Sequence, residues 1–274
     1  MTITIDRVGR TETGTPARLP DEQGVVVRDG VHVHWERYGE NGPAILLMPT
    51  WSVVHSRVWK PQVGYLARHF RVFTFDGRGN GLSDRPVDAA AYDSREFAAD
   101  GVAVLDAAGL ERACVAGTSM GGLRALLLAD AHPERVDGLV LIDATVPLLT
   151  PAPSGREGVS FDDDLEHYEG WAKYNRHHWL RDYRDFLEFF FGQVFPEPHS
   201  TKQIEDCVAW GLDTTGETLI LTMDGGDSGL ADRAAAEAMC RSVRCPVGVV
   251  HGTQDAVNPL ARGERVAELT GGEL

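Results

Sequence analysis

Short apolar runs separated by longer helical patterns dominate the chain from about residue 24 onward. Continuous apolar runs of this kind are typical of strands that are buried on both faces of a sheet. They lie at 44–48, 71–75, 113–116, 138–142 and 247–250. Apolar residues at helical spacing lie between them, most clearly over 94–108 and 120–131. Strands that alternate with helices form βαβ units, so we expect an α/β fold with a mostly parallel sheet and helices on both faces.

Two β-rich segments precede the first of these runs. Residues 25–27 and 31–35 flank Asp29-Gly30, a dipeptide that favours a tight hairpin turn. Residues 1–22 are polar, include Gly and Pro, and show no periodicity. We therefore expect a loose N-terminal leader over 1–22, followed by a hairpin.

The alternation of strands and helices breaks between residues 147 and 228. This stretch is rich in aromatic residues and His, contains no convincing strand, and is bounded by prolines at its start and by Gly225-Gly226 at its end. Leu180, Tyr183, Leu187 and Phe190 recur at helical spacing. We predict a helical cap over 147–228, inserted into a core formed by 23–146 and 229–274. The aromatic side chains of the cap either line an apolar pocket or bury the cap against the core.

Charge and cysteine usage exclude several classes of protein. The chain has 41 acidic and 26 basic residues, a formal net charge of −15 that repels phosphate backbones and anionic lipid heads. No apolar run approaches the ~18 residues of a membrane helix, and the N-terminus carries no apolar signal segment. The four cysteines show neither a Cys-x-x-Cys pair nor zinc-ligand spacing. We expect a cytoplasmic protein with reduced thiols that binds no nucleic acid, no membrane and no metal.

The strongest chemical signal is the segment Gly117-Thr118-Ser119-Met120-Gly121. It follows an apolar run directly and opens a helical pattern, which is the context of a nucleophile elbow. A sharp turn from strand to helix forces the Ser into an unfavourable backbone conformation and requires small neighbours. The hydroxyl of Ser119 then projects at the start of the helix. There the Met120 N–H and the positive helix end can stabilise an oxyanion.

From about residue 24 to the end, the motifs resemble those of the α/β-hydrolase fold family, especially its small esterases, lipases and cofactor-free haloperoxidases. Residues 75–83 are similar to the family's Asp-x-Arg-Gly-x-Gly-x-Ser loop, and 141–143 are similar to its sixth strand. Residues 251–255 resemble its seventh strand, where a trailing Asp serves as the triad acid. The predicted cap follows the sixth strand, where the family carries its cap.

The resemblance implies a mechanism without a cofactor. Ser119 would attack the carbonyl carbon of a small apolar acyl substrate, and Asp255 would orient a His base. The N–H groups of Met120 and Trp51 would form the oxyanion hole. The chain departs from the family at Pro49-Thr50-Trp51, where members usually read His-Gly-x, and Pro and Thr restrict the backbone of the second donor.

Three further charged residues have alternative or structural roles. Asp143, at the end of its predicted strand, is an alternative acid, although Asp255 matches the family's usual position better. Asp76 and Arg78 look catalytic by type. In this family, however, the Asp and Arg of this loop mainly fix backbone turns, and we expect the same here.

The catalytic His is absent from the position that the resemblance implies. After Asp255 the chain has a helical pattern over 259–269 and a Gly-Gly turn, with neither a His nor an eighth strand. His55 and His251 are alternative bases. The most economical interpretation is a serine hydrolase that is truncated or impaired. The alternatives are a non-catalytic α/β-hydrolase-like module and a cofactor-free perhydrolase or haloperoxidase that uses the same triad.

Overall fold

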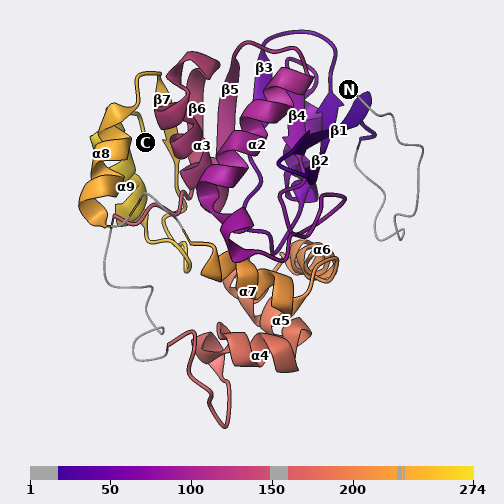
Figure 1. The fold of residues 1–274 in the computed structure, drawn as a ribbon. Coiled ribbons are helices and arrows are strands. Elements are labelled where there is room, and N and C mark those ends of the chain that lie inside the picture. Colours follow the sequence, from indigo (N-terminus) through magenta and orange to yellow (C-terminus); the bar gives the residue numbers. More distant parts are fainter. Residues whose placement is uncertain (1–17, 149–159, 227–229, 231) are drawn as a thin grey trace.

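A single sheet of seven strands organises the computed structural model, which describes residues 18–148, 160–226, 230 and 232–274 (Figure 1). In the order β1-β2-β4-β3-β5-β6-β7, the strands from β4 to β7 pair in parallel, whereas β2 is antiparallel to both its neighbours. The mostly parallel sheet that the sequence predicts is therefore confirmed. The strands are β1 (Glu22–Arg28), β2 (Val31–Tyr38), β3 (Ala44–Leu47), β4 (Arg71–Phe75), β5 (Ala113–Thr118), β6 (Val136–Ile142) and β7 (Val247–Val250).

The helices fall into two groups in Figure 1. Those that pack against the sheet are α1 (Lys60–Leu66), α2 (Ser94–Ala107), α3 (Met120–Ala131), α8 (Arg233–Ser242) and α9 (Leu260–Thr270). The others lie beyond one end of the strands and are α4 (Arg176–Arg181), α5 (Tyr183–Val194), α6 (Thr201–Gly211) and α7 (Gly216–Asp224). Short 3-10 turns are η1 (Ser56–Trp59), η2 (Ala89–Tyr92), η3 (Pro133–Arg135) and η4 (Gly170–Lys173). We call residues 170–224 the helical segment.

Both faces of the sheet are covered. Successive residues of a strand point to opposite faces, and the buried clusters follow this alternation. Leu46 and Val115 belong to the largest cluster, together with apolar residues of α2, α3, α8 and α9. Leu47 and Ala116 face the other way and pack with Val63 of α1. The prediction of helices on both faces is confirmed.

The helical segment has a core of its own. Aromatic and aliphatic side chains of α4 to α7 form a third buried cluster with Trp51, Val53 and Val54 from the loop after β3. The helical pattern around residue 180 is divided at Asp182, which ends α4 and whose carboxylate caps α5 by accepting from the Asp185 N–H. Leu180 is 55% exposed as a result and is not part of this core.

Parts of the predicted division of the chain lie outside the described residues. These parts are 1–17 of the leader, 149–159 and 227–228 of the predicted cap, and 229 and 231 of the predicted core. Near the end of the described chain, a single backbone bridge lies outside the seven named strands. Glu273 pairs in parallel with Gly248, since its N–H donates to Val247 O (3.1 Å) and its carbonyl accepts from the Val249 N–H (2.7 Å). This bridge uses backbone groups alone, so no side-chain pattern predicts it.

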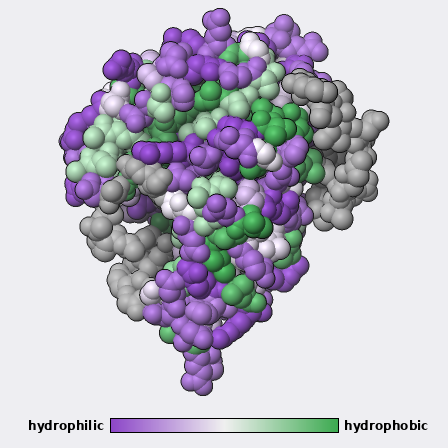
Figure 2. All heavy atoms as spheres, in the orientation of Figure 1, coloured by the Kyte–Doolittle hydropathy of each residue, from purple (hydrophilic) through white to green (hydrophobic). Residues whose placement is uncertain are grey.

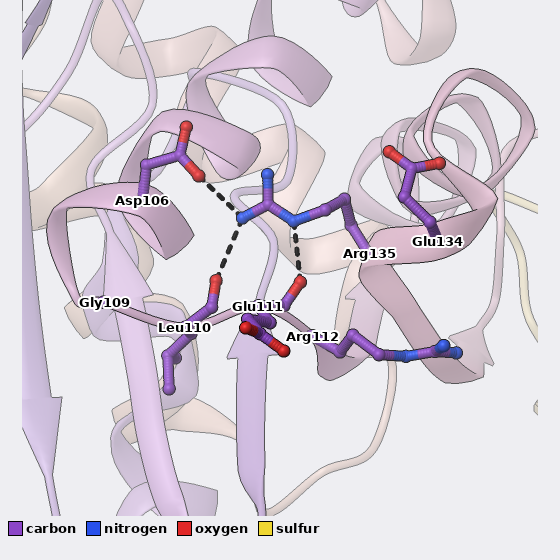
Figure 3. A pocket seen from close by; sticks show the side chains of 7 residues that line it. All are labelled: Asp106, Gly109, Leu110, Glu111, Arg112, Glu134 and Arg135. Carbon is purple, nitrogen blue, oxygen red and sulfur yellow. Dashed lines mark hydrogen bonds and ion pairs between the residues drawn. The ribbon is translucent and has the colours of Figure 1, made fainter.

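The visible surface is mostly hydrophilic, and apolar atoms appear on it only in smaller groups (Figure 2). Among the described residues, no helix combines the length and the hydropathy needed to cross a bilayer. A shallow depression of about 500 Å³ lies between α2 and η3 (Figure 3). Its Arg135 donates to Asp106 Oδ1 (2.7 Å), Leu110 O (3.0 Å) and Glu111 O (2.7 Å). This arginine therefore braces the loop between α2 and β5.

Candidate active site

Ser119 lies at the sharp turn between β5 and α3. Its backbone has φ 52° and ψ −121°, a conformation that costs a non-glycine residue roughly 1–3 kcal/mol. A Cβ on Gly117 would stand 2.1 Å from Gly121 O, and a Cβ on Gly122 would stand 2.5 Å from the Ala144 Cβ. The turn therefore needs its glycines, as the sequence predicts. Two backbone bonds fix it to the end of β6: Ser119 N to Ile142 O (2.9 Å) and Thr145 N to Ser119 O (3.0 Å).

A chain of polar side chains starts at the Ser119 hydroxyl. Ser119 Oγ lies 3.1 Å from Thr145 Oγ1, and the Asn258 amide donates to that same Thr145 oxygen (3.1 Å). Asn258 is fixed in turn, because its amide also donates to Asp143 O (3.0 Å) and its Oδ1 accepts from Arg262. Thr145 and Asn258 thus hold the Ser119 hydroxyl in one orientation.

Asp255 and Asp143 follow the ends of neighbouring strands, β7 and β6. Asp255 Oδ1 accepts from the N–H groups of Val257 (2.7 Å) and Asn258 (2.8 Å). Asp143 Oδ1 accepts from the Gly252 N–H (3.0 Å). Burial raises the pKa of Asp143, and the nearby charge of Asp255 raises it further. Among the described residues, no hydrogen bond joins Ser119 directly to either carboxylate.

One large cavity brings these groups together. It has a volume of about 1470 Å³ and is lined by Ser119, Asp143 and Asp255 from the sheet side. Phe190 of α5 and Trp210 of α6 line it from the helical segment. Its size exceeds the ~300–1,000 Å³ of ordinary small-molecule sites. The aromatic side chains of the helical segment have both expected roles. Phe190 and Trp210 line the cavity, whereas Phe186 and Trp179 are buried in the segment's own core.

Both predicted oxyanion donors, Met120 and Trp51, line this cavity beside Ser119. Met120 opens α3, so its N–H has no acceptor within the helix. The loop that carries Trp51 is held by Arg124 of α3, which donates to Pro49 O (3.2 Å) and to Thr50 O. Arg124 thereby ties the second donor's loop to the helix that begins with the first donor.

The alternative bases His55 and His251 do not reach the cavity. All ten histidines belong to the described part of the chain, and none of them lines it. His55 packs edge-on against Trp210 and its Nε2 lies 3.4 Å from Asp213. The side chain of His251 is fully buried, with Nε2 2.8 Å from Asn258 O.

The same contact of His251 bears on metal binding. One ligand atom each from Asp143, His251 and Asp255 lies within 4.8 Å of the others, a spacing that suits a metal ion. However, Asn258 O requires a proton on Nε2, the imidazole nitrogen that lies 3.8 Å from Asp255. A protonated nitrogen has no lone pair for a metal, so the hydrogen bond of Nε2 to Asn258 O and a metal bond at Nε2 exclude each other.

Comparison with known proteins agrees with this geometry. The model of the alpha/beta hydrolase fold matches residues 43–163, which hold β3 to β6 and the Ser119 turn. The chain has the α/β-hydrolase fold. The esterase RhEst1 from Rhodococcus sp. ECU1013 has a similar α/β-hydrolase structure, with a TM-score of 0.73 at 24% identity over 91% of this chain and 87% of that one.

Two curated relatives are similar in sequence to this chain. The AB hydrolase superfamily protein YisY from Bacillus subtilis is 29% identical over 84% of this chain and 82% of its own. The 3-oxoadipate enol-lactonase 1 from Acinetobacter baylyi is 34% identical over 40% of each protein. The matches to other curated relatives are also partial, and there the chain spans only 31% to 43% of the relative's length.

The sequence motifs did not indicate Thr145 and Asn258. Neither belongs to a motif, yet each follows a strand whose carboxyl end lies at the same sheet edge as Ser119. That rule, applied to polar residues just after 138–142 and 247–250, could have found them. The structural roles expected for Asp76 and Arg78 are confirmed. Asp76 accepts from the N–H groups of Ser56 (3.0 Å) and Leu82 (2.9 Å), and Arg78 pairs with Asp100.

Asp143→Asn is expected to raise the thermal unfolding midpoint at pH 7 and to leave it unchanged at pH 3. Because the folded-state pKa of Asp143 is raised, the unfolded chain loses this proton first as the pH rises. Stability therefore falls between the unfolded and folded pKa values and stays lower above both. Asn retains an acceptor for the Gly252 N–H without the charge. Thermal melts at both pH values measure the effect, and Asn in place of the exposed Asp137 is the control. A lower midpoint at pH 7 for Asp143→Asn would contradict the expectation that the charge of Asp143 destabilises the fold.

Proposed function

We propose that the chain is a serine hydrolase that cleaves small apolar esters or related acyl compounds through Ser119. The Ser119 oxygen forms a bond to the carbonyl carbon, and the bond from that carbon to the leaving oxygen breaks. The hydroxyl proton passes to a base, and the leaving alcohol takes up a proton. Water then releases the acid from the acyl-enzyme. The strained turn that presents Ser119 to a large cavity is the observation that carries this proposal.

The oxyanion hole of the proposed reaction consists of the Met120 and Trp51 N–H groups. Their position supports this role, because both residues line the cavity beside Ser119. The N-terminus of α3 adds a favourable field for a developing negative charge. Asp255 is the proposed acid, since it follows β7 and lines the same cavity as Ser119.

The substrate class follows from the wall of the cavity. Tyr174, Phe190 and Phe191 of the helical segment contribute aromatic surface to it. We therefore assign the helical segment the role of a cap that binds the acyl part of the substrate. The names of the relatives, an enol-lactonase and an esterase, denote acyl chemistry of the same kind.

The expected rate depends on the base. No histidine lines the cavity, and the group bonded to Ser119 Oγ is the hydroxyl of Thr145, which is a very weak base. We therefore propose an impaired hydrolase that acylates slowly. In a comparable enzyme that lacks a triad member, the oxyanion hole and substrate binding alone still accelerate the reaction roughly 10³–10⁴-fold over water. The same observation favours a second candidate, a non-catalytic module that binds apolar acyl compounds.

Hydrolysis of p-nitrophenyl acetate by the chain and by Ser119→Ala tests the proposal. The parent rate should be slow but above that of Ser119→Ala. Imidazole hydrolyses this ester by itself, so the expected effect of added imidazole is a larger difference between the rates of the parent and of Ser119→Ala. Ser242→Ala is the matched control, because the Ser242 hydroxyl donates hydrogen bonds to Asp130 and to Met239 O, neither of which lines the cavity. Equal rates for the parent and Ser119→Ala, with p-nitrophenyl ester still bound in calorimetry, would identify the non-catalytic module instead.

A further inference from the structure

Trp51 joins the sheet to the helical segment. Its backbone belongs to the loop after β3, whereas its indole N–H donates to Thr222 Oγ1 in α7 (2.8 Å). The Thr222 hydroxyl donates onward to Leu219 O (2.6 Å), so its lone pair is free to accept the indole proton. The indole N–H donates to the Thr222 hydroxyl, and this hydroxyl donates to a carbonyl of the same helix. The two hydrogen bonds therefore fix the indole relative to α7.

The indole ring is also enclosed by aromatic rings of the helical segment. The ring centroids of Tyr174, Trp179, Phe186 and Phe190 lie 5.7, 5.6, 6.2 and 5.5 Å from it. Such separations are typical of favourable aromatic pairs. Trp51 is only 9% exposed, so a change in its orientation requires a shift of α4 or α5.

The residues just before Trp51 are fixed from the opposite side. Arg124 of α3 donates to the carbonyls of Pro49 and Thr50, and its guanidinium lies 3.4 Å from the centre of the Phe97 ring. The peptide that ends in the Trp51 N–H therefore lies between the nucleophile helix and the helical segment. Its orientation depends on both.

We propose that the Trp51 side chain is a positioning group through which α5 and α7 set the direction of the Trp51 N–H in the oxyanion hole. The inference rests on the proposed function and extends it: the helical segment contributes to transition-state stabilisation besides binding the acyl part. A misdirected N–H weakens the bond to the oxyanion more than it weakens substrate binding. The effect therefore falls on kcat and leaves KM unchanged.

Three variants test this role by p-nitrophenyl acetate hydrolysis: Thr222→Val, Trp51→Phe and the double variant. Thr222→Val keeps the shape of the side chain and removes the acceptor, and Trp51→Phe removes the donor. We expect each single variant to lower kcat about tenfold, less than the roughly 10²–10³ lost with a whole oxyanion donor. The double variant should lose no more than either single one, because both substitutions remove the same hydrogen bond.

Thr218→Val is the matched control. Thr218 lies one turn earlier on α7, bonds Thr215 and does not line the cavity. It should retain the parent kcat. A parent kcat for Thr222→Val, or losses in the two single variants that multiply in the double one, would overturn the inference.

The rate of Ser119 labelling by a fluorophosphonate, followed by intact-protein mass spectrometry, is a second readout that resolves slow reactions. Labelling should slow in Thr222→Val and not in Thr218→Val. Labelling that is Ser119-dependent but equally fast in Thr222→Val refutes only the positioning role. A parent that is labelled no faster than Ser119→Ala refutes the proposed function, and the positioning role with it.

Discussion

Asp100→Asn is expected to lower the free energy of unfolding by about 3 kcal/mol, since one partner of a buried ion pair is removed. Asp100 is fully buried and accepts from Arg78 Nε (2.6 Å) and Nη2 (2.9 Å) and from Arg28 Nε (2.8 Å). Arg78 is 2% exposed. Asn would leave its guanidinium charge buried without its bidentate carboxylate. Urea unfolding at constant m-value measures the loss.

The control for this variant is Asp29, which pairs with Arg28 as Asp100 does. Asp29 pairs with Arg28 Nη1 at 2.9 Å, but its side chain is 78% exposed. Exposed pairs contribute up to about 1 kcal/mol and often nothing measurable, so Asp29→Asn should change the stability little. If both substitutions had equally small effects, the buried pair would not support the loop that carries Arg78.

Gly117→Ala is expected to destabilise the fold by about 3 kcal/mol and to abolish the reactivity of Ser119. The added Cβ would stand 2.1 Å from Gly121 O and 2.6 Å from Gly122 N. These are backbone atoms of the first turn of α3, so only a shift of that helix away from β5 relieves the overlap. Overpacking of this kind costs roughly 1–3 kcal/mol, and more where the backbone must move. Urea unfolding and ester hydrolysis on one preparation measure both effects.

Gly192→Ala provides the comparison. Gly192 lies within α5, and its Cβ would meet no atom within 4 Å. Ala should therefore stabilise that helix by up to about 1 kcal/mol. Normal stability and reactivity in Gly117→Ala would show that the turn tolerates a side chain and would remove the structural reason for its glycine.

Hydrophobic patterning located the elements of the fold well. The expected strand at 71–75 matches β4 (Arg71–Phe75), and the expected helix at 120–131 matches α3 (Met120–Ala131). Buried parallel strands are continuous apolar runs, and helices repeat every 3.6 residues, so both leave a local signal. The turn at Ser119 was predictable for the same reason: its constraint is local and requires small residues at fixed positions.

The contacts around Ser119 were not predictable in this way. Thr145 and Asn258 are separated by 113 residues in the sequence, and their hydrogen bond depends on β6 and β7 lying side by side. Trp51 and Thr222 are 171 residues apart and meet only because α7 folds back over the loop after β3. Polar pairs at such separations have no periodicity. They follow from the topology and not from the local sequence.

The identity of the residue that a fluorophosphonate modifies tests the central claim most directly. The whole chain is incubated with the reagent and digested, and the modified peptide is sequenced by mass spectrometry. Ser119 Oγ would bond to phosphorus and displace fluoride. We predict a single adduct on Ser119, formed slowly, accelerated by imidazole and absent from Ser119→Ala. An unmodified Ser119 under conditions that label other serines of the chain would contradict the account.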